Sequence, residues 1–373
     1  MKRLAAGVLA AAGILLAGCS PAVPVDDRSP SAGGTGSGAA GVSQAPAQPA
    51  PPPPVPAASP PSSLSPASGI SAAERLAAVL GNPGKPVRIA LLGDSFASGE
   101  GAGSYLPVDG VADSLCHRSA EALFAGVPDS AADDGGPGSG RAAALRQPEA
   151  PVIFNLACSR AETASLGSAQ QVAGHEPAGV PAQLDELAGL RPDLVLLYVG
   201  GNDLGFADLL QACLLDAEPC SSDPALHADL AANLTRLQGS LGELYREVEA
   251  AAAAPVLVLP YPRLFDPGAE DCGRLSPEEL DFGLGVTDAL NNVLEQSVHA
   301  AARPGVRYVE ALEESFAGRG ACSGDALVNT ARMGALLEAA GSESASLEVL
   351  HPTAEGYRVM SADLLAWLES HPL

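Results

Sequence analysis

Five short apolar runs constrain the fold of this chain more than any other feature. Each run is nearly continuous in Val, Leu, Ile and Ala instead of alternating with polar residues, which is typical of parallel strands covered on both faces. The runs occupy residues 87–92, 152–156, 194–199, 256–259 and 306–309. They predict a buried parallel sheet.

Helical patterns separate the later runs. Apolar residues in steps of four and three form one stripe of a predicted helix, namely Leu230, Leu234, Leu237, Leu241, Leu244 and Val248. Ser276 followed by Pro277 predicts a helix start, with an end near residue 302. A last helix is expected between Pro352 and about residue 370. Alternating strands and helices predict βαβ crossovers and a three-layer α/β/α sandwich.

The beginning of the chain predicts export. Lys2 and Arg3 precede an apolar run at 4–16 that is too short to span a membrane, and Leu-Ala-Gly then leads into Cys19. We expect a signal peptide at 1–18 of the bacterial lipoprotein type, with Cys19 lipidated; the alternative is ordinary secretion with cleavage nearby. Residues 19–70 would form the lipidated N-terminus and a disordered tether rich in Pro, Ala, Ser and Gly. The folded domain would be 71–373.

Charge and cysteine content narrow the classes of partner. The net charge of −24, with 44 acidic against 20 basic residues and no basic patch, argues against a nucleic acid or an anionic surface. Six cysteines follow Cys19, and an even number in an exported chain indicates disulfides, although six cysteines allow fifteen pairings. The sequence-local choice is Cys116–Cys158, Cys213–Cys220 and Cys272–Cys322, of which proximity strongly favours only the middle pair. Their spacing does not fit a zinc site, and we expect no metal.

Polar motifs follow three of the predicted strands. They are Gly93-Asp94-Ser95, the segment 155–160 that ends in Ser159-Arg160, and Gly200-Gly201-Asn202-Asp203. Because the carboxyl ends of parallel strands share one edge, these motifs should meet there. Residues 102–150, rich in Gly and Pro, are expected to form a long irregular insertion beside that edge.

The residue types at this edge suit nucleophilic catalysis. A serine hydroxyl such as that of Ser95 needs a neighbouring imidazole to take its proton, and His351 stands ahead of the last helix. A third group must orient the imidazole, and Glu348 precedes His351 by three residues. The alternative for Ser95 is a helix cap. Asp94 and Asp203 are expected to hold their turns, and no Gly-x-Ser-x-Gly elbow surrounds Ser95.

Taken together, these blocks resemble the SGNH hydrolases, also called GDSL-type esterases and lipases, and in particular their secreted, disulfide-bonded actinobacterial branch. The resemblance covers residues 87 to about 358 and implies a flavodoxin-like fold with a five-stranded parallel sheet. It implies Ser95 as nucleophile, His351 as general base, and an oxyanion hole made by the Ser95 N–H and the Asn202 amide. In part of this branch a backbone carbonyl takes the place of Glu348.

One position departs from the family pattern. Arg160 stands where the family commonly has a glycine whose N–H helps to hold the oxyanion. A backbone donor does not require glycine unless φ is positive, so we expect the Arg160 N–H to serve. Alternatively, the arginine side chain pairs with the substrate or with a nearby acid.

The expected function is that of an exported, monomeric serine esterase or lipase. It would hydrolyse small-molecule or lipid esters through an acyl-enzyme without a cofactor, either lipid-anchored to the outer face of the cell membrane or secreted. Acyl transfer to sugar or lipid acceptors is one alternative, and a non-catalytic ligand-binding lipoprotein is another. The remaining histidines are expected mostly at the surface: His117, His175, His227, His299 and His371.

Overall fold

The computed structural model describes most of the chain after residue 70. The described ranges are 71–112, 114–125, 150–206, 209, 213, 219–269, 272, 275–329 and 348–373. The predicted signal peptide and tether lie outside these residues, as does the part of the predicted insertion at 126–149.

The predicted parallel sheet is confirmed. Its five strands are all parallel and follow the order β2-β1-β3-β4-β5. They are β1 (Arg88–Gly93), β2 (Val152–Asn155), β3 (Leu194–Tyr198), β4 (Val256–Val258) and β5 (Val306–Tyr308). β1, β3 and β4 are almost wholly buried, whereas β2 is an edge strand in which Val152 is 43% exposed. The central strands therefore carry the core.

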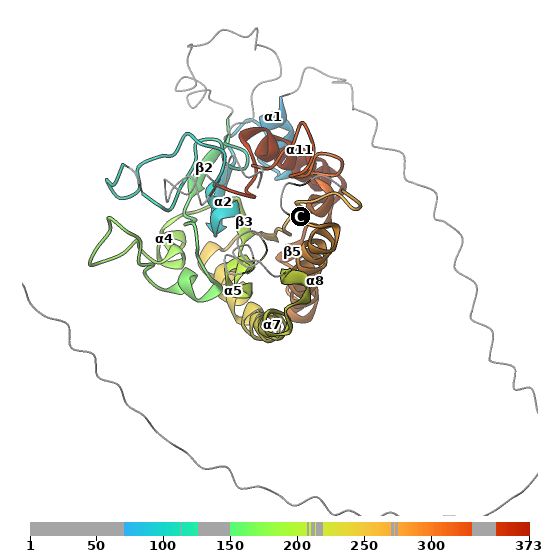
Figure 1. The fold of residues 1–373 in the computed structure, drawn as a ribbon. Coiled ribbons are helices and arrows are strands. Elements are labelled where there is room, and N and C mark those ends of the chain that lie inside the picture. Colours follow the sequence, from blue (N-terminus) through green and yellow to red (C-terminus); the bar gives the residue numbers. More distant parts are fainter. Residues whose placement is uncertain are drawn as a thin grey trace, which may run out of the picture. The chain divides into compact units, whose positions relative to one another are not determined.

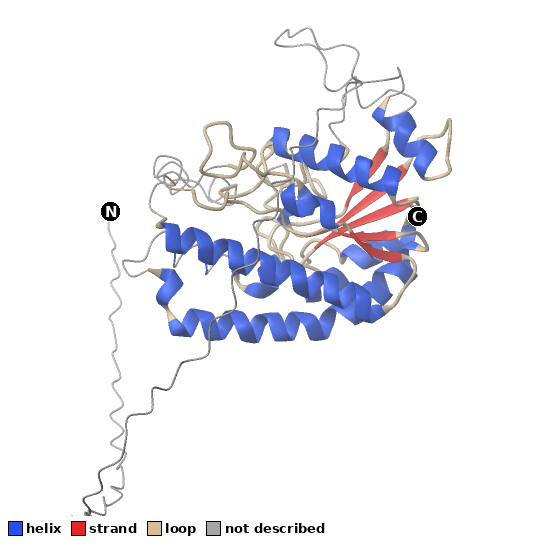
Figure 2. Cartoon of the chain, turned by 90° about the vertical axis from the view of Figure 1, so that its right-hand side faces the viewer, coloured by secondary structure: helices blue, strands red, loops and turns tan. Residues whose placement is uncertain are grey.

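Helices lie on both sides of the sheet, which confirms the three-layer sandwich (Figures 1 and 2). The α-helices of the described chain are α1 (Ala72–Val79), α2 (Ser95–Ser98), α4 (Gln183–Gly189), α5 (Gly201–Leu204), α7 (Pro224–Ala252), α8 (Pro277–Ala301) and α11 (Ala354–Ser370). Short 3₁₀ turns are η1 (Thr163–Gly167), η2 (Cys220–Ser222) and η3 (Glu310–Glu314). α7 packs against α8 on one side and α1 against α11 on the other. Within the described ranges no helix has both the length and the apolarity needed to cross a bilayer.

The long helices follow from their sequences as expected. The Ser276 hydroxyl accepts from the Glu279 N–H, the Glu279 carboxylate accepts from the Ser276 N–H, and Pro277 occupies the first position of α8. In α7 the predicted apolar stripe faces the core, where Leu237, Leu241 and Val248 are buried. Burial of this stripe holds the helix against the sheet.

The described part of the insertion after Ala102 is irregular, as expected. It contains turns and isolated bridges, such as that between Tyr105 and Ser119. The Arg118 guanidinium donates to the carbonyls of Leu156 and Ala157, both at 2.8 Å. The insertion is thereby fastened to the segment that follows β2.

Gly93, the last residue of β1, brings the strand end close to its neighbour. Its φ is +124°, a conformation that L side chains rarely adopt. A Cβ at this position would lie 1.6 Å from the carbonyl oxygen of Tyr198 in β3. The buried amide of Gln183 in α4 pairs with both the N–H and the C=O of Gly93, each at 2.8 Å. Only glycine fits this junction between two strands and a helix.

Replacing this glycine tests the junction. Because the added methyl group meets main-chain atoms that cannot move aside, we expect Gly93→Ala to lower the free energy of unfolding by more than about 4 kcal/mol. Urea unfolding measures the change. Gly242 is the matched control: it is exposed in α7, a Cβ there meets nothing within 4 Å, and Gly242→Ala should stabilise by about 0.5–1 kcal/mol. Equal effects at the two glycines would refute the steric argument.

Candidate functional site

Ser95 is placed by the turn that ends β1. Asp94 is the N-cap of α2, and its carboxylate accepts from the Phe96 N–H at 3.0 Å. Ser95 is then the first residue of the helix, at the carboxyl edge of the sheet. The helix cap that the sequence allowed for Ser95 is therefore Asp94 instead. The Ser95 hydroxyl makes another contact.

That contact is with the predicted base. Nε2 of His351 lies 2.7 Å from the Ser95 hydroxyl, and the His351 ring packs against the Phe96 ring with centroids 5.1 Å apart. Its other ring nitrogen, Nδ1, lies 3.2 Å from the carbonyl oxygen of Val349. The hydroxyl and the imidazole are thus in the geometry that proton transfer requires.

Glu348 contacts a different partner. Its carboxylate accepts from the Tyr105 hydroxyl at 2.7 Å, and the Tyr105 oxygen accepts in turn from the Gly101 N–H at 3.0 Å. The structure therefore sets the Val349 carbonyl against the imidazole and Glu348 against a tyrosine. Of the two orienting groups considered from the sequence, this geometry favours the backbone carbonyl.

Asn202 lies in α5, the short helix that follows β3. Its side-chain amide donates to the Ala161 carbonyl at 3.0 Å, and a primary amide has a second hydrogen to offer. Asp203 also reaches the segment after β2, where its carboxylate accepts from the N–H of Thr163 at 2.9 Å and from its hydroxyl at 2.6 Å. Asn202 and Asp203 therefore tie the turn after β3 to the segment after β2, which contains Arg160. Both segments carry predicted donors of the oxyanion hole.

Arg160 adopts the backbone conformation that glycine prefers. Its φ is +66°, in the left-handed region, and its side chain is exposed. This explains why a glycine is common at the matching place, because a residue with a Cβ costs about 1 kcal/mol more in that conformation. Glycine is expected to matter here only if φ is positive. The φ is positive, and Arg160 adopts this conformation without a glycine.

A buried hydrogen-bond chain joins the nucleophile turn to the Asn202 turn. The Tyr261 hydroxyl donates to the Asp94 carboxylate and accepts from the Gly201 N–H at 3.0 Å. Burial raises the pKa of Asp94 to about 7, although the hydrogen bonds from Tyr261 and Phe96 stabilise the ionised carboxylate and lower the pKa. Burial likewise raises the pKa of Tyr261, which keeps its hydroxyl a donor. The buried amide of Asn291 fixes Tyr261 in place by pairing with its N–H and C=O at 2.9 and 2.8 Å.

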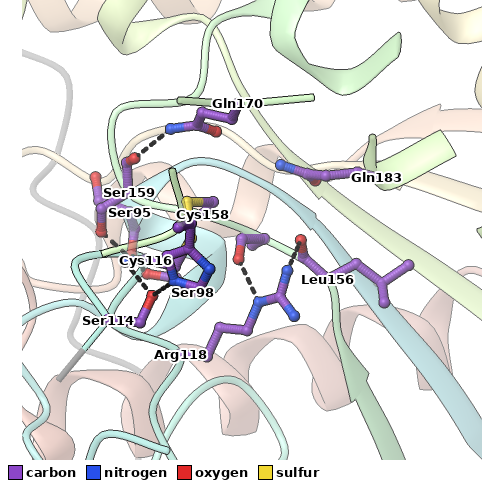
Figure 3. The surroundings of a disulfide bond; sticks show 12 residues. Ser95, Ser98, Ser114, Cys116, Arg118, Leu156, Cys158, Ser159, Gln170 and Gln183 are labelled. Carbon is purple, nitrogen blue, oxygen red and sulfur yellow. Dashed lines mark hydrogen bonds between the residues drawn. A yellow bond between two sulfur atoms is a disulfide. The ribbon is translucent and has the colours of Figure 1, made fainter. Parts of the chain in front are cut away.

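The three disulfides of the structure are the sequence-local pairs Cys116–Cys158, Cys213–Cys220 and Cys272–Cys322. The first is wholly buried and joins the insertion to the segment that leads to Arg160. Figure 3 shows it beside Ser95, Ser98 and Ser159, with Arg118 nearby. No group of three or more metal-ligating side chains occurs among the residues that the structure describes.

Of the remaining histidines, His227 and His299 are exposed and His371 is half-buried, whereas the expectation of a surface position is wrong for His117 and His175. These two are only 3% and 8% exposed, and each has a buried polar partner that offsets the cost of burial. His117 Nδ1 lies 2.6 Å from the Glu100 carboxylate, and His175 Nε2 lies 2.8 Å from the Ser114 hydroxyl. Sequence reasoning also missed Glu100 itself. The available signals were an acid between two glycines just after the predicted nucleophile, and a histidine beside a paired cysteine.

Comparisons with known proteins agree with this architecture. A model of the GDSL-like Lipase/Acylhydrolase family matches residues 91–359. Lipase 1 of Streptomyces coelicolor is 30% identical over 268 residues, which cover 70% of this chain and 83% of that lipase. A lipase of Streptomyces rimosus is 30% identical over 238 residues, covering 62% of this chain and 72% of its own.

Two crystal structures share the fold. Phospholipase A1 from Streptomyces albidoflavus NA297 has a TM-score of 0.53 at 27% identity, covering 77% of this chain and 99% of that enzyme. An extracellular lipase from Streptomyces rimosus has a TM-score of 0.52 at 26% identity, covering 76% and 99%. The resemblance inferred from the sequence blocks is confirmed: the chain belongs to the GDSL-like lipase/acylhydrolase family and is a carboxylic ester hydrolase.

Proposed function

We propose that this hydrolase works through an acyl-enzyme on Ser95, with His351 as general base. The observation that carries the proposal is the 2.7 Å contact between Ser95 Oγ and His351 Nε2. Oγ attacks the ester carbonyl and its proton passes to Nε2; the same proton then goes to the departing alcohol. Water repeats the sequence in the second half, so that the carboxylic acid leaves and Ser95 regains its proton.

The negative oxygen formed in each half-reaction needs fixed donors. We assign this role to the N–H groups of Ser95 and Arg160 and to the Asn202 amide, whose second hydrogen remains after its bond to Ala161. The positive φ of Arg160 supports the assignment, since it is the conformation that the family's glycine would supply there. An arginine can provide the same backbone N–H at a modest conformational cost.

The Val349 carbonyl is our proposed orienting group for His351. A carbonyl oxygen at 3.2 Å can accept the Nδ1 proton and thereby present the unprotonated Nε2 to Ser95. Glu348, the carboxylate first considered for this role, is placed with Tyr105 instead. Its contribution to the imidazole would then be indirect.

For substrate and location we propose lipid esters outside the cytoplasm. Relatives bearing the names lipase and phospholipase A1 support the first, and the three disulfides support an oxidising compartment. The Leu-Ala-Gly-Cys19 motif and the segment that follows it favour a lipid anchor. Such an anchor would keep the domain near a membrane while the tether gives it reach.

Replacing the nucleophile tests the mechanism. Ser95→Ala should abolish hydrolysis of p-nitrophenyl esters of graded acyl length, and thermal unfolding should shift by only a few degrees. A fluorophosphonate probe should label the folded wild type and not the variant. Retained turnover in the variant would refute the mechanism. A folded wild type that the probe fails to label would contradict a nucleophilic Ser95.

A second variant separates the two orienting groups. Because glutamine still offers an acceptor to Tyr105, we expect Glu348→Gln to lower kcat by less than about threefold if the Val349 carbonyl orients His351. A carboxylate bonded to the imidazole predicts a far larger loss, since replacing such an acid by its amide costs about 10⁴-fold in the serine-protease triad. Steady-state kinetics on one soluble ester distinguish these results.

The anchor has its own test. In the native host, labelled palmitate should be incorporated into the wild type and not into Cys19→Ala, because the variant offers the acyl chains no attachment site. Electrophoresis of the labelled, immunoprecipitated protein measures the incorporation, and Ser43→Ala, in the expected tether, is the control that leaves Cys19 in place. Equal incorporation into the wild type and Cys19→Ala would rule out lipidation at this residue.

A further inference from the structure

Glu100 is a wholly buried carboxylate close to the nucleophile. It lies between Gly99 and Gly101, just after α2, and is 0% exposed. One carboxylate oxygen lies 2.6 Å from His117 Nδ1, and the other accepts from the Ser159 hydroxyl at 2.5 Å. An ionised carboxylate only accepts hydrogen bonds and is costly to bury without them. A buried acid at this position therefore calls for a role that an apolar residue would not fill.

The backbone of Glu100 belongs to the nucleophile segment. Its N–H donates to the Ser95 carbonyl at 3.0 Å, and its own carbonyl accepts from the buried Tyr357 hydroxyl, also at 3.0 Å. The main chain of Glu100 is therefore fixed to the helix that begins with Ser95. The groups bonded to the Glu100 carboxylate are therefore fixed in position relative to that helix.

One of the groups held is Ser159, which immediately precedes Arg160. The Ser159 carbonyl accepts from the Gln170 side chain at 2.8 Å, as drawn in Figure 3. Because the peptide group is planar and trans, the Arg160 N–H points opposite to that carbonyl. Glu100 fixes the Ser159 side chain and Gln170 fixes its peptide plane. Together they determine the direction of the proposed oxyanion donor.

The other group held is His117, which extends the network toward the base. The His117 ring stacks on Tyr105 with centroids 4.2 Å apart, and Tyr105 donates to Glu348, three residues before His351. Gly101 allows the segment after α2 to approach His351 closely, because a Cβ at this glycine would lie 2.9 Å from the Cβ of His351. The buried network thus reaches all three segments of the site.

The first disulfide closes the same network covalently. Cys116 precedes His117 and Cys158 precedes Ser159, so the bond joins the residues next to both partners of the carboxylate. The Ser159 N–H also donates to the Cys116 carbonyl at 3.2 Å. The disulfide fixes the distance between the two loops, and the carboxylate fixes their placement relative to Ser95.

We propose that Glu100 is a positioning residue for the oxyanion hole. Through Ser159 it holds the Arg160 N–H in place relative to the Ser95 hydroxyl, while its other carboxylate oxygen contacts the buried His117 ring. The inference rests on the proposed acyl-enzyme mechanism, in which that N–H stabilises the charged oxygen. Displacement of a donor by even about 1 Å can cost on the order of 100-fold in rate.

The principal test is Glu100→Gln. Glutamine offers one acceptor and one donor in place of two acceptors, so it cannot accept from both His117 and Ser159. We expect kcat for a p-nitrophenyl ester to fall about 10- to 100-fold, with KM changed by less than about threefold, because the oxyanion forms only after binding. Kinetics are measured well below the melting temperature of the variant.

Glu279→Gln is the matched control. Glu279 is also a buried glutamate that accepts from a serine hydroxyl, that of Ser276 at 2.9 Å, but it caps the start of α8. We expect this variant to melt at a lower temperature than the wild type and to keep its kcat. If Glu100→Gln behaves in the same way, Glu100 serves stability alone and the proposal is overturned.

Ser159→Ala decides the matter if Glu100→Gln does not fold. It removes only the hydroxyl bonded to Glu100 and should lower kcat about tenfold, whereas Ser159→Thr keeps a hydroxyl and should restore most of the rate. A folded Ser159→Ala variant with unchanged kcat overturns the inference. If the wild type is active and the Glu100 and Ser159 variants keep its kcat, the role of Glu100 is refuted while the Ser95 mechanism stands. A wild type that neither turns over esters nor takes up the fluorophosphonate probe would defeat the proposed function itself.

Discussion

The close approach of β1 and β3 at Gly93 is the constraint on which the rest of the site depends. The missing side chain lets the turn after β1 pass against the Tyr198 carbonyl, and the Asp94 N–H donates to that carbonyl at 2.8 Å. α2 then begins at Ser95 in a fixed direction. The same strand end receives the Cys158 N–H at 3.1 Å, so the segment leading to Arg160 is attached to it as well.

Buried polar chains connect the separate segments of the site. Tyr261 connects the Asp94 turn to the Asn202 turn, and Glu100 connects the Ser95 helix to Ser159 and His117. Such groups are costly to bury unless each is satisfied, and a satisfied network specifies one arrangement. Apolar contacts tolerate small displacements, whereas a hydrogen bond loses most of its strength when its geometry is disturbed. Polar chains therefore suit a site in which donors must be placed accurately.

Arg160 departs from the family motif in its side chain but keeps the backbone conformation that favours glycine. The matching glycine is common because the backbone there takes a positive φ, as Arg160 does with φ +66°. In the proposed mechanism the group that acts at this position is the backbone N–H, which any residue except proline supplies. The substitution changes the conformational energy of the loop and adds an exposed cation, while the backbone donor is kept.

Local sequence determined the elements and the chemical types of this protein. Continuous apolar runs predicted the parallel strands, the Ser276 and Pro277 cap predicted the start of α8, and strand-ending motifs predicted Ser95 and Asn202 at one edge. These features depend on neighbours in the chain and are therefore visible in it. Tertiary structure alone decided which partners meet: the Val349 carbonyl beside His351, Tyr105 bonded to Glu348, Tyr261 bonded to Asp94, and Glu100 between His117 and Ser159. Those contacts join residues that are mostly far apart in the sequence, or depend on which way a turn faces, and spacing along the chain does not record either.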